Sequence, residues 1–203
     1  GAGKTTILET IEGLIPPTSG HTEVLGRNVQ RYPREIKERI GVQLQASAYF
    51  EHLTLREILE LFGSFYRRRL PARALLETVG LSDKAETVLG KLSGGQQQRF
   101  TLAASLVNDP DVVFLDEPTT GLDPKVRRSI WEVVQEIHRI GRTVVLTTHY
   151  MEEAQALCGR VAIMDMGGIV ALDTPSNLIR QLPVPYRIHV GGEVPLPLDE
   201  LRG

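Results

Sequence analysis

The stretch Leu92-Ser93-Gly94-Gly95-Gln96 leads through Gln97-Gln98-Arg99 into an apolar helical pattern. Two adjacent glycines after a serine leave backbone N–H groups uncovered at the start of a helix. The serine hydroxyl, these amides and the positive helix end then point at one place, which makes an anion site. On its own, Ser-Gly-Gly is more typical of a flexible turn. The interpretation therefore depends on two further motifs.

The second motif lies at the N-terminus, where the chain reads Gly1-Ala2-Gly3-Lys4-Thr5-Thr6. It fits the end of a phosphate-binding loop, in which backbone amides wrap the phosphates, the lysine neutralises the outer ones and the hydroxyl binds Mg²⁺. The first glycine of that pattern and the strand before it do not occur in this sequence, so we expect a fragment that starts inside the loop. A helix is expected over 5–13. Taken alone, Gly-Lys at an ordinary helix N-terminus is the alternative.

The third motif is Val112-Val113-Phe114-Leu115-Asp116-Glu117, an apolar run that ends in two carboxylates. Such a run is typical of a strand in a parallel sheet that is covered on both faces. A turn, a long helix closed by Gly141 and a strand over 143–146 follow. The alternation of strands and helices predicts an α/β fold, with a mainly parallel sheet flanked by helices.

The segment between the first two motifs differs in character. Residues 46–91 carry helical patterns at 54–66, 71–79 and 83–89, and Thr54 with Glu57 predicts a capping box. We interpret this segment as an inserted helical subdomain. The remainder forms a core over 1–45 and 92–182, and 183–203 start a C-terminal extension. Further elements of the core are expected at 22–25, 34–39, 40–45, 96–108, 160–164 and 169–172, together with a helix after Tyr150 that ends near Cys158 and Gly159.

Composition narrows the class of protein. The 203 residues are 41% hydrophobic and 24% charged with a net charge of −2, so bulk electrostatic binding to nucleic acid or anionic lipid is not indicated. No apolar run approaches the ~20 residues that span a bilayer, and a membrane role would need a partner. The one cysteine, Cys158, fits a reducing compartment.

Several side chains near the predicted strand ends suit phosphoryl transfer. Lys4 can bridge the outer phosphates, while Thr5 and Asp116 can hold Mg²⁺ directly or through water. Glu117 is placed to polarise water as general base. Because the carboxyl ends of parallel strands meet at one edge of a sheet, these groups are expected to converge. The simpler interpretation of Asp116-Glu117-Pro118 is a solvated strand end, which would leave the order of the two carboxylates unexplained.

Two more polar residues follow predicted strands. His149 could contact the γ-phosphate or orient the attacking water, and Gln45 has an amide able to reach the metal or the water. Taken singly, His149 could equally be an ordinary loop histidine and Gln45 an ordinary edge residue. The order of all the motifs along the chain favours the functional interpretation.

In this order the motifs resemble those of the ATP-binding subunits of ABC transporters, most similar to bacterial drug and multidrug exporter ATPases. The resemblance covers residues 1 to about 182 and implies a P-loop NTPase fold, ATP hydrolysis and the cofactors ATP and Mg²⁺. It implies that Thr5, Gln45 and Asp116 bind the metal and that Glu117, His149 and Gln45 are catalytic. The nucleotide-binding residues that it implies are Gly1, Ala2, Gly3, Lys4, Thr5, Thr6, Ser93, Gly94, Gly95, Gln96 and Asp123.

The resemblance also implies an assembly. Two ATPase subunits would pair head to tail around two ATP molecules, so that Ser93, Gly94 and Gly95 complete the site of the opposite subunit and Asp123 lies along the dimer interface. The surface near Gln45 and the inserted helices would receive a helix from a membrane-spanning permease, at the cytoplasmic face of the membrane. In the family, an aromatic residue that stacks on adenine precedes the phosphate-binding loop, ahead of Gly1.

Two other functions compete with transport. Soluble ABC-type ATPases that act on ribosomes or DNA usually carry tandem ATPase halves or a long coiled coil. Here no sustained heptads separate the first two motifs and there is no basic excess, so no nucleic-acid partner is expected. An unproductive remnant that binds nothing is the other alternative, although Lys4, Asp116, Glu117 and His149 are all present. The transported compound is not encoded in these motifs.

Overall fold

The computed structural model describes residues 2–43 and 52–181. Its centre is a three-stranded parallel sheet in the order β3–β4–β5, formed by Ile40–Val42, Val112–Asp116 and Thr143–Thr147. Val112 lies opposite Ile40 on one side and Thr143 on the other. The predicted parallel sheet is confirmed, and β4, which ends in Asp116, lies in its middle.

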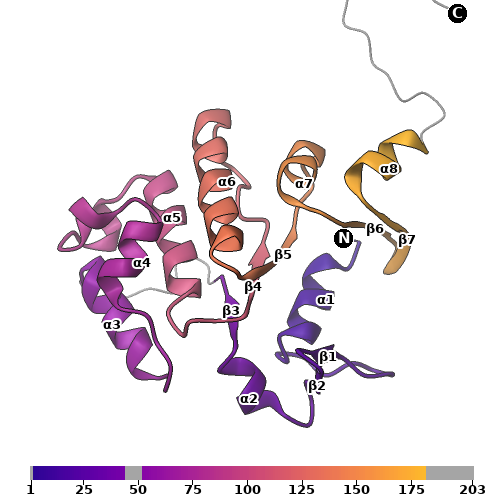
Figure 1. Cartoon of the computed structure of the whole chain (residues 1–203), viewed down its shortest axis with the longest axis horizontal. Helices are drawn as coiled ribbons and strands as arrows, with labels where there is room; N and C mark the ends of the chain where they lie inside the picture. Colours follow the sequence, from indigo (N-terminus) through magenta and orange to yellow (C-terminus); the bar gives the residue numbers. More distant parts are fainter. Residues whose placement is uncertain (1, 44–51, 182–203) are drawn as a thin grey trace, which may run out of the picture.

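Alternate side chains of β4 pack into two different hydrophobic cores, because successive side chains of a strand point to opposite faces of the sheet. Val113 and Leu115 are buried in the larger core with the helices from α3 to α6. Val112 and Phe114 are buried in the smaller core with α1 and α2. Helices therefore cover both faces of the sheet, as the apolar run in the sequence predicts (Figure 1).

Eight α-helices surround the sheet within the described residues. The first four are α1 (Lys4–Ile11), α2 (Pro33–Lys37), α3 (Leu55–Ser64) and α4 (Ala72–Thr78), and the other four are α5 (Gly94–Ser105), α6 (Pro124–Arg139), α7 (Met151–Leu157) and α8 (Pro175–Arg180). The sequence interpretation contains all of these except α8. None of them is long and apolar enough to cross a membrane.

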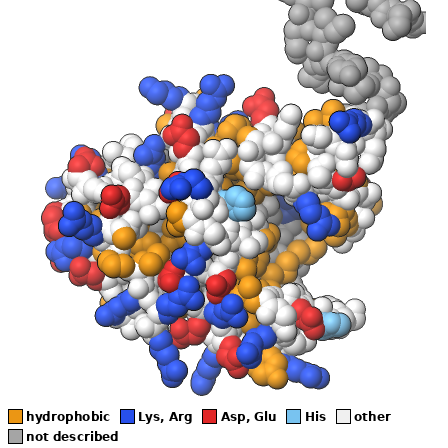
Figure 2. Space-filling view, viewed as in Figure 1, with side chains coloured by type: hydrophobic (Ala, Val, Ile, Leu, Met, Phe, Trp, Pro, Cys, Tyr) orange, Lys and Arg blue, Asp and Glu red, His pale blue; other side chains and the backbone are white. Residues whose placement is uncertain are grey.

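Two antiparallel hairpins complete the fold. β1 (Glu23–Val24) pairs with β2 (Arg27–Asn28), and β6 (Val161–Asp165) pairs with β7 (Gly168–Asp173). Figure 2 shows charged side chains of both signs over α3 and α4, whereas apolar side chains are exposed on the side of β6 and β7. Within residues 2–43 and 52–181, β5 pairs with β4 alone and β6 with β7 alone.

The predicted helix over 83–89 is wrong. The chain instead makes 3₁₀ turns at Ser82–Lys84 and Leu89–Lys91. Backbone carbonyls between the two turns are used by α3, since the N–H groups of Leu55 and Arg56 donate to the carbonyls of Thr87 and Ala85, both at 3.0 Å. These hydrogen bonds hold the segment between the two turns against the start of α3, in place of a continuous helix. The predicted capping box at Thr54 and Glu57 is present at the start of α3.

Ion pairs connect the helical segment with the sheet. Arg68 donates to Asp109 at 2.6 Å, and Arg142 also donates to Asp109, just ahead of β4. Burial opposes ionisation of Asp109, but the hydrogen bond from Arg68 and the charge of Arg142 outweigh it and lower its pKa. Arg39 likewise donates to Asp111 at 2.8 Å across 72 positions of sequence. Arg68, Arg142 and Arg39 therefore hold the residues just before β4 in place.

Candidate functional site

The start of α1 forms an open anion site. Gly3 has a φ of 89° at the N-cap, and its carbonyl accepts the N–H of Ile7 at 3.0 Å. No side chain among the described residues caps this helix end, so its first amides are available to a ligand. Lys4 is half-buried there, and the described residues supply it with no hydrogen bond or ion pair. The carbonyl of Ala2 accepts from the N–H of Gly167 at 3.2 Å, which holds this end of the chain against the β6–β7 turn.

Asp116 lies beside α1, as expected. Thr5 Oγ1 donates to Asp116 Oδ2 at 3.1 Å. The other carboxylate oxygen, Oδ1, accepts from Oγ1 of Thr147, which is paired with Asp116 across the sheet. The structure thus places a hydroxyl and a carboxylate in contact at the end of β4.

The backbone turns sharply after Asp116. Glu117 has a φ of 46°, in the left-handed region, and its N–H donates to the carbonyl of Thr147 at 3.2 Å. Its Oε2 accepts from Thr120 Oγ1 at 3.0 Å and lies 3.4 Å from Nδ1 of His149. The turn therefore separates the two carboxylates, leaving Asp116 on Thr5 and directing Glu117 to His149.

The carboxyl group of Glu12 interacts electrostatically with this site. Glu12, at the end of α1, is only 7% exposed. Burial, and next the negative charge of Asp116, raise the pKa of Glu12 to about 7. The carboxylates around α1 already repel one another, so a cation at Asp116 would relieve an existing excess of negative charge.

The 92–96 motif is built as a helix cap. Ser93 Oγ accepts from the N–H of Gln96 at 3.3 Å, and Gln96 Oε1 accepts from the N–H of Ser93 at 2.9 Å, which closes a capping box on α5. Gly95 packs so closely on α6 that an added Cβ would lie 2.5 Å from Cγ1 of Val126. A hollow of about 270 Å³ opens beside Ser93, Gly95 and Gln96.

Within the described residues, this motif and the α1 site are separate. No hydrogen bond or ion pair described in the structure joins residues 93–96 to Lys4, Thr5 or Asp116, and α5 lies on the other side of the sheet from α1 (Figure 1). Asp123 is exposed and caps α6 by accepting from the N–H groups of Lys125 and Val126, both at 3.0 Å. Gln45 and Gly1 lie outside the described residues.

Sequence reasoning missed two hydroxyls of the site. Thr147 binds Asp116 and Thr120 binds Glu117. The signal for Thr147 is its place at the end of an apolar strand, where it faces the same edge as Asp116. Neither the β4–β5 register nor the turn geometry can be read from composition, so the two pairs become visible only in the fold.

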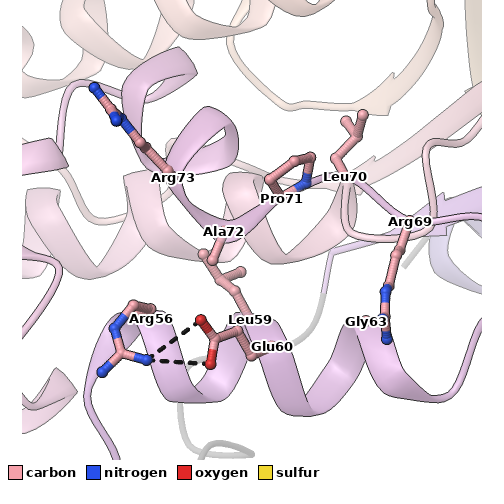
Figure 3. A pocket seen from close by; sticks show the side chains of 9 residues that line it. All are labelled: Arg56, Leu59, Glu60, Gly63, Arg69, Leu70, Pro71, Ala72 and Arg73. Carbon is pink, nitrogen blue, oxygen red and sulfur yellow. Dashed lines mark hydrogen bonds and ion pairs between the residues drawn. The ribbon is translucent and has the colours of Figure 1, made fainter.

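A second and larger hollow lies away from this site, between α3 and the start of α4. It has a volume of about 610 Å³ and an apolar lining that includes Leu59, Leu70 and Pro71. In Figure 3, Arg56 and Glu60 are joined by hydrogen bonds at one side, and the side chain of Arg69 runs beside Gly63 at the other. The remaining lining residues are Ala72 and Arg73.

The geometry at the end of β4 suits a phosphate ester and a hard cation. The helix end and Lys4 match anionic oxygens, and the Thr5–Asp116 pair offers the kind of oxygen ligands that Mg²⁺ takes. No group of three or more His, Cys, Asp or Glu in residues 2–43 and 52–181 is arranged to hold a metal. Thr5 and Asp116 would each offer one oxygen-bearing side chain to a cation at this site.

Comparison with known proteins matches the chain to one family. The family model described as ABC transporter matches residues 1–120. The daunorubicin resistance ATP-binding protein DrrA2 of Streptomyces coeruleorubidus is 45% identical over 88% of this chain and 57% of its own length. The Nod factor export ATP-binding protein I of Paraburkholderia xenovorans is 41% identical over 99% of this chain and 68% of its own. The chain thus spans roughly three fifths of the length of these relatives.

Solved structures also align with this chain. CbiO1 of Clostridium perfringens, part of the ABC transporter complex cbiONQ, aligns with a TM-score of 0.78 and 25% identity over 89% of this chain and 76% of its own. A dimeric ATP-binding cassette in a post-hydrolysis state, bound to ADP and Pi, aligns with a TM-score of 0.74 and 28% identity over 86% of this chain and 81% of its own.

Proposed function

The chain belongs to the ABC transporter ATP-binding family, and on that premise we propose that it binds and hydrolyses ATP to power export of a substrate through a membrane-spanning permease. The observation that carries this proposal is the convergence of Thr5, Asp116, Glu117 and His149 at one edge of the sheet. Its relatives named for daunorubicin resistance and Nod factor export support the direction of transport. The cargo is left open.

Each residue has a role in this reaction. The amides at the start of α1 and Lys4 bind the β- and γ-phosphates. Thr5 and Asp116 would hold Mg²⁺, with Gln45 as a further proposed ligand, and the ion would offset charge on the phosphate oxygens. Glu117 accepts a proton from the attacking water.

His149 orients the Glu117 carboxylate and the γ-phosphate. Its Nδ1 is within reach of Glu117 Oε2, at 3.4 Å. A contact this long would tighten when nucleotide is bound.

The 92–96 motif acts in a second subunit. Its distance from α1 in the fold supports a head-to-tail dimer, in which Ser93, Gly94, Gly95 and Gln96 face the nucleotide of the partner copy and Asp123 lies along the interface. The dimeric ATP-binding cassette among the structural neighbours supports this arrangement. In such a dimer, the helical segment 46–91 is a subdomain that presents the 92–96 motif to the nucleotide site of the partner copy.

The hollow between α3 and α4 is the surface we assign to the permease, at the cytoplasmic face of the membrane. Its floor is apolar and its rim carries Arg56, Arg69 and Arg73 against the single carboxylate of Glu60 (Figure 3). Arg56 is already paired with Glu60 and Glu86, whereas Arg69 and Arg73 have no ion pair to a described residue. An apolar helix that carries an acidic side chain fits this chemistry.

A comparison of ATP turnover tests the proposal. In the complete protein, Glu117→Gln is expected to lower the turnover rate about 10²–10⁴-fold and to accumulate an ATP-bound dimer. Glu77→Gln, at an exposed position of α4, is the matched control and should keep the parental rate. Turnover of the Glu117→Gln variant at the parental rate would overturn the proposed role. ATP-dependent co-sedimentation with ribosomes would favour the soluble ATPase alternative instead.

A further inference from the structure

One buried carboxylate outside the nucleotide site connects three elements of the fold. Glu153, in the first turn of α7, is 0% exposed. Its Oε1 accepts a hydrogen bond from Thr119 Oγ1 at 2.8 Å and another from Trp131 Nε1 at 2.9 Å. Thr119 lies in the turn after β4 and Trp131 lies in α6. One oxygen atom thus holds the turn, α6 and α7 together.

Thr119 belongs to the turn that carries the proposed general base. Its neighbour Thr120 donates through Oγ1 to Glu117 Oε2 at 3.0 Å and through its N–H to the Glu117 carbonyl at 3.2 Å. Glu117 itself has a left-handed backbone, with φ at 46°, a conformation that costs about 1–2 kcal/mol for an L-residue. Such a conformation persists only when its surroundings fix it. The orientation of the Glu117 carboxylate therefore depends on the contacts that hold residues 118–120 in place.

The turn is fixed from two sides. From α5, Gln98 Nε2 donates to the carbonyl of Pro118 at 2.6 Å. From α7, Glu153 accepts from Thr119, which is 1% exposed. Because α7 begins directly after the segment that holds His149, Glu153 ties the turn of Glu117 to the segment of His149.

Packing alone does not explain a glutamate at this position. The second carboxylate oxygen, Oε2, is fully buried and has no hydrogen-bond partner among the described residues. Burying a polar oxygen in this way lowers stability, and an apolar side chain would avoid that cost. A function that needs an acceptor at Oε1 accounts for the residue.

We propose that Glu153 is a positioning residue for ATP hydrolysis, which acts through Thr119 to fix the turn that aims Glu117 at His149. This inference rests on the function proposed above. The two hydrogen bonds to Glu153 Oε1 should then differ in their effect on turnover, because only the bond from Thr119 leads to the turn. The bond from Trp131 leads to the middle of α6.

Paired variants test this separation in the complete protein. Thr119→Val and Trp131→Phe each remove one of the two hydrogen bonds. We expect Thr119→Val to lower kcat about 10- to 100-fold, the range for a misplaced catalytic group, with KM for ATP near the parental value. Trp131→Phe should keep kcat within about twofold, and Thr119→Ser, which keeps the hydroxyl, should restore the parental kcat. Equal kcat in the two single variants, or no recovery in Thr119→Ser, would overturn the proposal.

A spectroscopic readout checks the network itself. Trp131 is the only tryptophan of the chain, so its fluorescence reports on the bond to Glu153. Glu153→Leu is expected to shift the emission maximum and to lower kcat as Thr119→Val does. Glu153→Gln keeps a carbonyl oxygen for both donors and should keep most of kcat. An unchanged emission maximum in Glu153→Leu would contradict the network.

The outcome separates this inference from the proposed function. If the parent hydrolyses ATP, Glu117→Gln does not and Thr119→Val matches the parent, the function stands and the positioning role falls. If the parent has no turnover while it binds and folds normally, both fall.

Discussion

The carboxylate of Glu117 lies 3.4 Å from Nδ1 of His149, although the two residues follow different strands of the sheet. The pair exists because Glu117 leaves β4 through a left-handed turn and His149 leaves β5 two residues after Thr147. Neither side chain is deeply buried, so nucleotide and water can reach both.

His149→Ala removes the partner of Glu117. We expect kcat for ATP to fall roughly 10²-fold, the range for loss of a group that positions a general base. ATP affinity should be nearly unchanged, because Lys4 and the α1 amides are intact. Steady-state turnover and equilibrium binding of ATP measure the two quantities. His21→Ala, at an exposed histidine distant in sequence from these motifs, is the control, and equal turnover of both variants would contradict the role of His149.

Glu12 makes stability depend on pH. Its pKa is raised from 4.5 to about 7, so the folded chain holds this proton more tightly than the unfolded chain does. Between these two pH values the unfolded state binds fewer protons, and the free energy of unfolding falls as pH rises. We expect Glu12→Gln to gain about 1–3 kcal/mol over the parent between pH 5 and pH 8.

Urea unfolding at the two pH values measures this gain. Glu132→Gln, at an exposed position on α6, should follow the parental pH dependence. Since the charge of Asp116 contributes to the shift, Asp116→Asn should move the pH transition of the parent downwards. A Glu12→Gln variant with the same pH dependence as the parent would exclude Glu12 as its source.

Gly95→Ala forces a contact with α6. The added Cβ would lie 2.5 Å from Cγ1 of Val126, whereas one added at Gly94 would meet nothing within 4 Å. We expect Gly95→Ala to lower the free energy of unfolding by about 1–3 kcal/mol and Gly94→Ala to leave it nearly unchanged. The double variant Gly95→Ala/Val126→Ala should recover most of the loss. Thermal unfolding of the parent, Gly95→Ala, Val126→Ala and the double variant gives the coupling energy, and an absence of coupling would refute the predicted contact.

The capping boxes at Thr54 and Ser93 allow the loss of a helix cap to be distinguished from the loss of a nucleotide contact. Thr54→Ala and Ser93→Ala each remove the side chain that caps a helix, and each should cost about 1 kcal/mol of stability. Only Ser93 is assigned to the nucleotide of a partner subunit, so only Ser93→Ala should also lower turnover of the dimer. Matched unfolding and ATPase measurements test this. Similar turnover of the two variants would leave Ser93 as a helix cap alone.

The arginines of the hollow between α3 and α4 should control permease binding. Arg69→Glu and Arg73→Glu together are expected to weaken co-purification with the permease at least about tenfold, through charge repulsion. The ATPase rate of the isolated subunit should not change. Arg34→Glu, on α2 and also exposed, is the control for a general charge effect. Retention of the permease by the double variant would place the contact elsewhere.

The elements that sequence patterns predict best here are those set by local rules. The apolar run of β4 divides its side chains between two cores, and the Thr54–Glu57 pair closes the predicted capping box. Both depend on spacing within a few residues. The phosphate-site pair Thr5 and Asp116 was also predictable, because helix start and strand end meet at one edge in parallel α/β folds.

What the sequence could not predict depends on contacts between distant segments. In place of the predicted 83–89 helix, the carbonyls of Ala85 and Thr87 accept hydrogen bonds from the start of α3, which is distant in sequence. Thr147 joins the site through its pairing with Asp116 across the sheet. The side-chain N–H of Trp131 donates to Glu153, and no local spacing relates these two positions.

The arrangement of β3 and β4 has a consequence for how this chain folds. Arg39 donates to Asp111 across 72 positions of sequence, so β3 and β4 close a long loop when they pair, and closing so long a loop early is entropically unfavourable. Packing of α3 and α4 against α5 shortens the effective loop and brings β4 towards β3. The helices should therefore form the folding nucleus, and Leu59→Ala should slow refolding. Thr5→Ala, at the edge proposed to bind nucleotide, should change only the unfolding rate.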